Sequence, residues 1–285
     1  MPHVSQAQRV AYQFETPTTQ VWNKLFVAGK TNDAQSIFWR VPKSVEELYD
    51  LQADKDEVNN LSQSPQYRST LEKMRTAERE QALKIRNVCF LPEREIHVRS
   101  EGTTPYEMAR DPSKYPLEQI LIAADQSSRI DSSDSAQLIE NLAARDSAIR
   151  YWGAMGLLMR GGDAVRSNKS VLQKALADES VNVRIVAAQS LGLYCDGELQ
   201  ALAIRTLGDL ASAETNGVLT AMSALAAIEA LGDVAKPLHD EIAKLKPSGP
   251  SPDDRYNSYV PRLIENTVPV LKPANGRPKA KAKAK

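Results

Sequence analysis

The sequence is poor in the side chains that build metal centres and disulfide frameworks. It holds two cysteines, Cys89 and Cys195, and three histidines, and neither cysteine lies in a Cys-x-x-Cys pair or a Cys/His cluster. A zinc site is therefore not predicted. We expect two buried free thiols, although the separation of the cysteines in sequence leaves a disulfide open. The histidines, His3, His97 and His239, are scattered, and we expect none of them to be catalytic.

Three further absences limit the partners and the location of the chain. The 36 basic side chains are balanced by 36 acidic ones, so we expect no strong attraction to nucleic acid or to an anionic membrane. The longest apolar runs, such as 218–227, are short and interrupted, which predicts no transmembrane helix. The first ten residues lack a basic stretch followed by an apolar one, so they do not form a signal peptide. The full sequence of 285 residues is 42% hydrophobic, enough for one large or two small domains.

Two helices are predicted near the start of the chain. Thr16 and Pro17 form a typical helix start, with threonine as the N-cap and proline in the first turn, and Gly29 is a plausible C-cap. A second, shorter helix is expected over 33–39. One apolar face of the first helix is formed by Val21, Trp22, Leu25 and Phe26. The second helix is expected to pack inward through Ile37, Phe38 and Trp39.

Carboxylates crowd into the stretch EELYDLQADKDEVNNL, residues 46–61. As an EF-hand loop starting at Asp54, it would have Val58 where an oxygen ligand is needed and Pro65 in place of the final glutamate. Acid–base catalysis would need partly desolvated carboxyl groups, whereas a polar turn is expected to be wet. We therefore predict neither a metal site nor acid–base chemistry here, and we assign no catalytic, cofactor-binding or metal-binding residue in the chain.

The same stretch shapes the predicted fold of residues 1–89. Leu48–Leu51 suits a short strand and 54–60 a polar turn, while Ser64 and Pro65 start a longer helix. Apolar residues at helical spacing along that helix are expected to form a core stripe: Tyr67, Leu71, Met74, Ala82, Ile85 and Val88. The fold class predicted for this part is α+β, a small sheet fragment with helices.

Two segments read as connections. Residues 90–116 contain four prolines and few periodic apolar positions, and we expect an ordered connector because their aromatic residues argue against disorder. Residues 246–285 begin with proline-rich spacing, which predicts a semi-rigid linker. Tyr256–Val270 is a candidate to pack back on the preceding helices. The end, GRPKAKAKAK, is expected to be a disordered, solubilising tail, with contact to polyanions as the alternative.

Residues 117–245 are rich in alanine and leucine and repeat internally. LAARDSAIRYWGAMGLL from Leu142 aligns with LADESVNVRIVAAQSLG from Leu176, an offset of 176 − 142 = 34, and a degraded third unit begins at Leu210. The unit resembles a short HEAT-like helix pair, which buries its apolar face only against a neighbouring unit. We therefore predict an all-α solenoid whose concave face is a candidate site for a protein or glycan partner.

The repeat places arginines at matching positions, Arg150 and Arg184. In a stacked solenoid such arginines pair with acidic residues in the turns. We therefore expect them to contact Asp146 and Glu179, and we do not read them as ligand-binding residues.

The carboxylate-rich stretch also carries a family resemblance. ELYDLQADKDEVNNL looks like the ELYDL..D..E..NL segment near the C-terminal end of type I sulfatases of the alkaline-phosphatase-like superfamily. Its flanks, from MPHVSQAQ to QSIFW and from FLPE to YPLEQI, resemble a bacterial subgroup that continues into HEAT-like repeats. The resemblance implies the C-terminal accessory part of a sulfatase-like sulfuric ester hydrolase. A HEAT-repeat scaffold that binds protein or glycan is the alternative.

The resemblance also shows which family features this sequence lacks. Those sulfatases use a C/S-x-P-x-R motif, whose Cys or Ser becomes formylglycine, and calcium held by their N-terminal domain. Here Phe-Leu-Pro-Glu follows Cys89, Asp-Gly-Glu-Leu follows Cys195, and the stretch from Ser248 has Pro252 where arginine is needed. We therefore expect no sulfatase activity from this chain alone, and neither calcium nor formylglycine in it.

The partner implied by the resemblance is the missing catalytic domain. Either Met1 is an internal residue of a longer sulfatase, or the chain is a stand-alone descendant that kept the non-catalytic part. In both cases we expect the aromatic residues near the start of the chain to be incompletely buried, because they would pack on the larger domain. The family is often exported or periplasmic, but the sequence itself leaves the location open.

Overall fold

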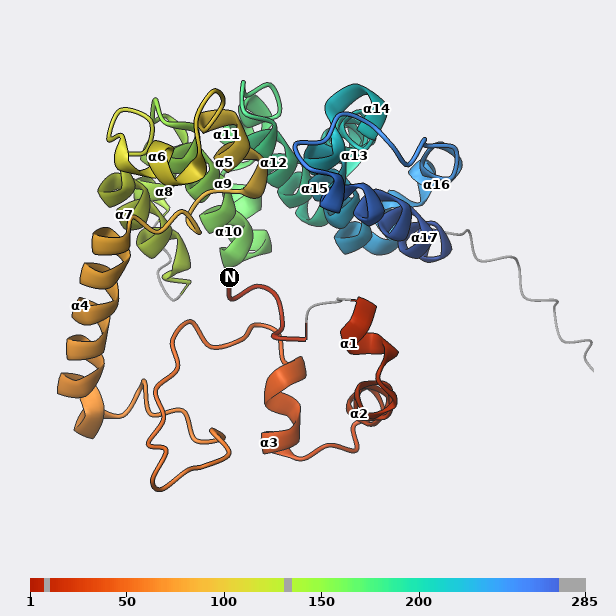
Figure 1. Ribbon diagram of the computed structural model, residues 1–285. Helices are drawn as coiled ribbons and strands as arrows, with labels where there is room; N and C mark the ends of the chain where they lie inside the picture. Colours follow the sequence, from red (N-terminus) through yellow and green to blue (C-terminus); the bar gives the residue numbers. More distant parts are fainter. Residues whose placement is uncertain (8–10, 131–134, 272–285) are drawn as a thin grey trace, which may run out of the picture. The chain divides into compact units, whose positions relative to one another are not determined.

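The computed structural model describes residues 1–7, 11–130 and 135–271, and within these residues the chain is helical and contains no β-strand (Figure 1). It divides into two compact units. The first comprises 1–92 and 98–164, and the second comprises 93–97 and the chain from 165 onward. The predicted α+β class is therefore wrong for the first 89 residues, whereas the all-helical remainder fits the predicted solenoid.

The helices of the first unit range from three to 18 residues in length. In order they are α1 (Ala11–Glu15), α2 (Pro17–Val27), α3 (Asp33–Ser36), η1 (Ile37–Trp39), η2 (Pro65–Tyr67), α4 (Arg68–Ile85), α6 (Pro105–Arg110), α7 (Leu117–Ser128), α8 (Ala136–Leu142) and α9 (Ser147–Arg160). The helix α5 (Glu93–Arg99) and the helix α10 (Gly162–Ser167) each have residues in both units.

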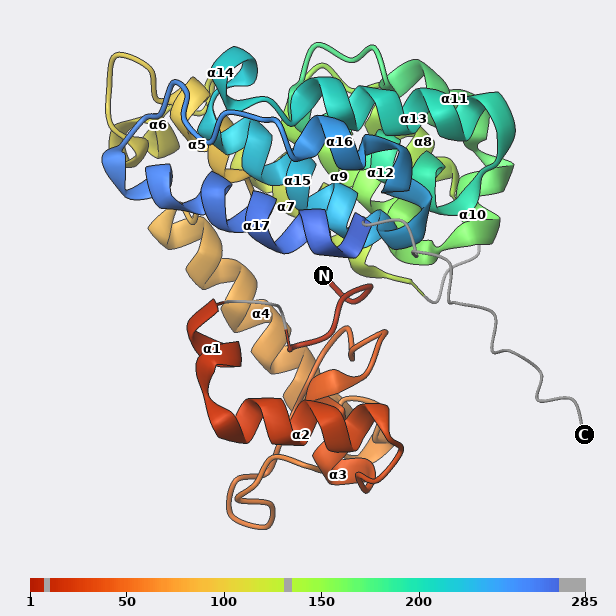
Figure 2. The same ribbon diagram turned by 90° about the vertical axis from the view of Figure 1, so that its right-hand side faces the viewer.

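The second unit is built mainly from longer helices (Figures 1 and 2). In order they are α11 (Lys169–Ala175), α12 (Val181–Tyr194), α13 (Gly197–Leu210), α14 (Ala213–Asn216), α15 (Val218–Leu231), η3 (Gly232–Leu238), α16 (His239–Ile242), η4 (Asp254–Ser258) and α17 (Tyr259–Leu271).

The first helices begin and end close to the predicted positions, and an aromatic cluster holds them together. Trp39 is its centre, with 6% of its surface exposed. Trp22 stacks on Phe38 with ring centroids 5.2 Å apart, while Phe14 and Phe26 each lie 6.1 Å from Trp39. Of these five rings only Trp39 is fully buried, so the cluster is a small, partly open core.

The predicted strand at Leu48–Leu51 is wrong, because its backbone bonds to a side chain instead of a neighbouring strand. The side chain of Asn60 donates to the Glu46 carbonyl at 2.9 Å and accepts from the Leu48 amide at 3.0 Å. Leu61 then donates to the Leu48 carbonyl at 2.7 Å. These bonds close a loop without a ladder, so the local alternation of apolar residues does not become a sheet.

The predicted core stripe along α4 is only partly correct. Leu71 and Ala82 are buried, but Met74 and Ile85 are 58% and 51% exposed. The helix ends at Arg86, which adopts a left-handed conformation with φ of 56°. Helical spacing therefore predicted the helix itself but not which part of its apolar face is covered.

The predicted connector is ordered, and it contains two helices that the sequence did not indicate, α5 and α6. The second begins with a capping box in which Thr104 and Glu107 satisfy each other's backbone amides. Tyr115 anchors the end of this segment, since it is fully buried and its hydroxyl donates to the Asn87 carbonyl. The guanidinium of Arg86 donates to the Tyr115 carbonyl at 2.9 Å, which ties the end of α4 to the same place.

The repeat period is visible in the helix starts. The second helices of the three sequence repeats, α9, α12 and α15, each have 14 residues. The first two start 181 − 147 = 34 residues apart, whereas the third starts 218 − 181 = 37 residues later. The short helix α14 accounts for this shift, because it is inserted before α15.

The segment 218–242 is the one described stretch long and apolar enough to cross a membrane by length and composition, which by itself is weak evidence. Its helix α15 contacts α12, α13 and α17 and is buried around most of its circumference. A core helix of a helical unit has the same properties, and α15 has this position in the second unit.

The proline-rich segment after the repeats is docked, and it leads into a helix that covers α15. The Val218 amide donates to the Pro250 carbonyl at 2.8 Å, and Lys246 pairs with Glu214 at 2.6 Å. Next comes α17, which packs along α15 (Figures 1 and 2). Val260 and Leu271 of α17 are fully buried. The expectation that Tyr256–Val270 packs back on the repeats is thus confirmed, while the predicted tail, 276–285, lies outside the described residues.

Gly249 is the tightest point of this docked segment. A Cβ atom at Gly249 would lie 1.9 Å from the carbonyl oxygen of Ala213 and 2.8 Å from the amide nitrogen of Glu214. Both neighbours are backbone atoms at the start of α14, so they cannot move aside as a flexible side chain would. The segment approaches α14 this closely only because residue 249 has no side chain.

We predict that Gly249→Ala destabilises the protein by about 1–3 kcal/mol, because the new methyl group forces the segment away from α14. Ser248→Ala is the matched control, since Ser248 is exposed, and it should change stability by no more than about 0.5 kcal/mol. Urea unfolding followed by circular dichroism measures both. Equal midpoints for Gly249→Ala and the control would show that the segment is not docked.

Candidate functional site

Two of the six carboxylates in the stretch 46–61, Asp50 and Asp54, are used in backbone turns. Asp50 accepts a hydrogen bond from the Gln52 amide at 3.0 Å. Asp54 accepts from the amides of Val58 at 3.2 Å and Asn59 at 2.7 Å. An aspartate that caps the turn following it has a structural role, which agrees with the predicted polar turn.

A different carboxylate of the stretch, Glu46, belongs to an ion-pair network. Arg75 of α4 donates through Nε to Glu46 at 2.5 Å, and a second nitrogen of its guanidinium contacts the other Glu46 oxygen. A third nitrogen donates to Glu72 at 2.8 Å. The hydrogen bond from Arg75 holds the pKa of Glu46 below its usual range, so this carboxylate stays ionised and is not suited to be a general acid.

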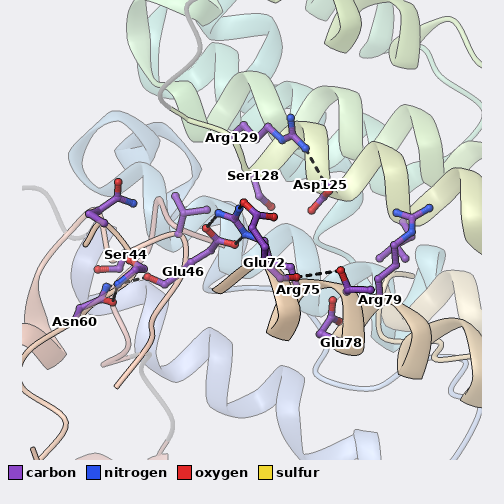
Figure 3. Close-up of a pocket in the computed structure, with 15 residues that line it drawn as sticks. Ser44, Glu46, Asn60, Glu72, Arg75, Glu78, Arg79, Asp125, Ser128 and Arg129 are labelled. Atoms are coloured by element: carbon purple, nitrogen blue, oxygen red, sulfur yellow. Dashed lines mark hydrogen bonds and ion pairs between the residues drawn. The ribbon is translucent and has the colours of Figure 1, made fainter. Parts of the chain in front are cut away.

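These groups line a cleft of about 980 Å³ in the first unit (Figure 3). Its walls are the segments 44–46 and 60–63, one side of α4, and α7. Figure 3 shows Glu46, Glu72 and Arg75 side by side in the cleft, with Ser128 of α7 above them. Sequence reasoning missed this site because Glu46 and Arg75 are 29 positions apart and no local motif marks them.

Charges of both signs line the cleft, and they are nearly balanced. The charged residues in its lining are Arg75, Arg79, Arg129, Glu46, Glu72, Glu78 and Asp125. Three arginines and four carboxylates give a formal charge of 3 − 4 = −1. The outer two arginines are also paired, since Arg79 lies 3.4 Å from Glu118 and Arg129 lies 3.5 Å from Asp125.

An apolar groove of about 530 Å³ lies along α2 in the same unit. Val21 and Leu25, one helical turn apart, line it and are 55% and 41% exposed. Trp22 forms another part of its wall and donates through its indole N–H to the Gln35 carbonyl at 2.7 Å. The predicted apolar face of α2 is therefore only partly covered in the described structure.

A largely enclosed ion pair in the first unit joins Arg99 to Asp146. Two nitrogens of Arg99 donate to the two Asp146 oxygens, each at 2.8 Å, and the side chains are 11% and 19% exposed. Burial alone would raise the pKa of Asp146. The hydrogen bonds and charge of Arg99, together with the amides of Ala148 and Ile149, outweigh burial and hold that pKa below its usual range.

The two repeat arginines have different surroundings, and the predicted pairing with a turn carboxylate is wrong for Arg184. Arg150 donates to the carbonyls of Ala144 and Arg145 at 3.1 and 2.8 Å, just beyond the end of α8. Arg184 makes no ion pair with Glu179 in the described structure, and its Nε is buried without a hydrogen-bond partner among the described residues.

The cysteines are both free thiols, as expected, but neither is buried. Cys89 is exposed and Cys195 is intermediate, and partial burial raises the pKa of the Cys195 thiol. In the second unit His97 lies 3.3 Å from the Tyr256 hydroxyl, which donates to Glu93 at 2.5 Å. This cluster joins α5 to η4 and so holds the start of the C-terminal segment.

Comparison of the chain with protein-family models, with curated proteins and with solved structures finds no match. Within 1–7, 11–130 and 135–271, no group of three or more His, Cys, Asp or Glu side chains is arranged to hold a metal ion. The cleft in the first unit is thus the candidate site defined by geometry.

We predict that Arg99→Ala costs about 3–5 kcal/mol of stability at neutral pH, because it leaves the Asp146 carboxylate enclosed without its partner. Because the folded pKa of Asp146 is depressed, the pair stabilises the protein above its ordinary pKa of 3.8. That stability is lost as the pH falls through the folded value, so the difference between variant and wild type should shrink there.

The control for this prediction is Arg145→Ala, a substitution of an exposed arginine in the turn before α9. It should change the free energy of unfolding by about 0.5 kcal/mol or less at every pH. Guanidinium chloride unfolding at a series of pH values measures both variants. A loss as small for Arg99→Ala as for Arg145→Ala at pH 7 would contradict the structural role assigned to the pair.

Proposed function

We propose that this chain is a non-catalytic accessory module of a sulfatase-like sulfuric ester hydrolase. The observation that carries the proposal is the exposed apolar side of α2, where Val21 and Leu25 border an open groove. An apolar patch of this kind is typical of an interface with another protein part. The ELYDL segment, which resembles that family, lies in the same unit, and the occupant that we propose for the patch is the catalytic domain.

The chemistry of the described charged groups agrees with a non-catalytic role. Arg75 keeps Glu46 ionised, and Asp50 and Asp54 are used in turns. The sequence contains no C/S-x-P-x-R motif around either cysteine or Ser248. Sulfate-ester hydrolysis would therefore require residues of the partner domain.

We expect the purified chain, supplied with calcium, to release no sulfate from aryl or sugar sulfates, because it contains no nucleophile motif. Ion chromatography of the released sulfate measures this, with a mock purification from the same host as the blank. Turnover above that blank that disappears on a single substitution in this chain would refute the non-catalytic assignment.

A second candidate function is that of a binding scaffold, and the repeat favours it. Two units with a period of 34 residues, each ending in a 14-residue helix, are the arrangement expected of a helical solenoid that presents an extended binding surface. Cross-linking of the full chain carrying Val21→Asp and Leu25→Asp separates the two candidates. Loss of the captured partner favours the α2 groove, whereas its retention favours the repeats.

A further inference from the structure

The charged groups that line the cleft of the first unit disfavour anionic ligands. This inference does not depend on the proposed relation to sulfatases. Each arginine in the lining of the cleft already contacts a carboxylate: Arg75 contacts Glu46 and Glu72, and the other two have one acidic partner each. A sulfate, phosphate or carboxylate ligand would have to displace one of these partners. The formal charge of −1 in the lining adds to the penalty for an anion.

The cleft keeps both hydrogen-bond donors and hydrogen-bond acceptors that are not used within the protein, and their positions are fixed. A guanidinium has five N–H donors, of which Arg75 uses three on Glu46 and Glu72. The two carboxylates in turn have unused acceptor positions. The main chain at Glu46 is held by Asn60, so donors and acceptors lie next to one another in a preorganised array.

Neighbouring hydroxyl groups of a sugar match such an array. One hydroxyl of a vicinal pair can donate to a carboxylate while the next accepts from the guanidinium. The ion pairs between Arg75 and the two carboxylates do not have to break. The cleft also offers an apolar surface, because Val45 lines it and is 46% exposed. Carbon-bound hydrogens on the face of a sugar ring would pack against this side chain.

From these features we infer that the cleft binds a neutral, hydroxyl-rich ligand, namely an uncharged oligosaccharide. Its volume of about 980 Å³ is at the upper end of the range for small-molecule sites, so it has room for more than one ring. Glu46, Glu72 and Arg75 orient the hydroxyl groups, and Val45 contacts a ring face.

The test is an NMR titration of the ¹⁵N-labelled full chain with uncharged gluco-, galacto-, manno- and xylo-oligosaccharides and, separately, with their sulfated and amine-bearing counterparts. At least one uncharged oligosaccharide should bind with a Kd in the range of about 0.1–1 mM and shift the resonances of Val45, Ser128 and the Arg75 side chain. Its affinity should not change with salt concentration. Glu72→Ala should weaken that binding by about fivefold, and Glu72→Gln, which keeps an acceptor, should weaken it less.

The matched control is Glu80→Ala, which removes an exposed carboxylate of α4 outside the cleft and should leave the affinity unchanged. Thermal unfolding confirms that each variant is folded. The inference is overturned if no uncharged oligosaccharide shifts cleft resonances, if the shifts map outside the cleft, or if only sulfated or amine-bearing sugars bind and do so in a salt-dependent way. The sulfate-release assay is independent of each of these outcomes.

Discussion

The half-buried ion pair of Arg99 and Asp146 is the interaction on which the first unit depends. Arg99 is the last residue of α5, and Asp146 is the N-cap of α9, so the pair joins the connector to the first repeat helix. The same guanidinium donates to the Lys114 carbonyl, just before fully buried Tyr115. One enclosed cation thereby positions a helix end, a helix start and the loop between them, which a surface ion pair would not do.

The repeat helices are held together by close backbone approach as much as by large side chains. In α9 a Cβ atom at Gly153 would lie 2.7 Å from the Leu138 carbonyl oxygen, and at Gly156 it would lie 2.6 Å from the Leu138 side chain. Gly192 of α12 has the same relation to Leu231 of α15, at 2.4 Å. Helices that meet this closely exclude water between them, and this favours a stack in which each helix is covered by its neighbour.

The sequence predicted the elements whose signals are local. Proline and glycine marked the ends of α2, and the offset of 34 predicted the start of α12 from that of α9. The strand at Leu48–Leu51 failed because an alternating pattern specifies a strand only where a partner strand exists, and here Asn60 takes its place. The cleft was not predictable, since its ion pair joins a loop to a helix 29 residues away.

The docked segment around Gly249 leads into a further helix, so the helical stack ends later than the repeats alone indicate. Counting repeats would place the boundary near Leu245, but fully buried Val260 and Leu271 belong to a helix beyond it. Removing that helix would uncover a side of α15, most of whose circumference is buried. The helix α17 therefore caps the second unit, and without it an apolar side of α15 would be exposed to other chains.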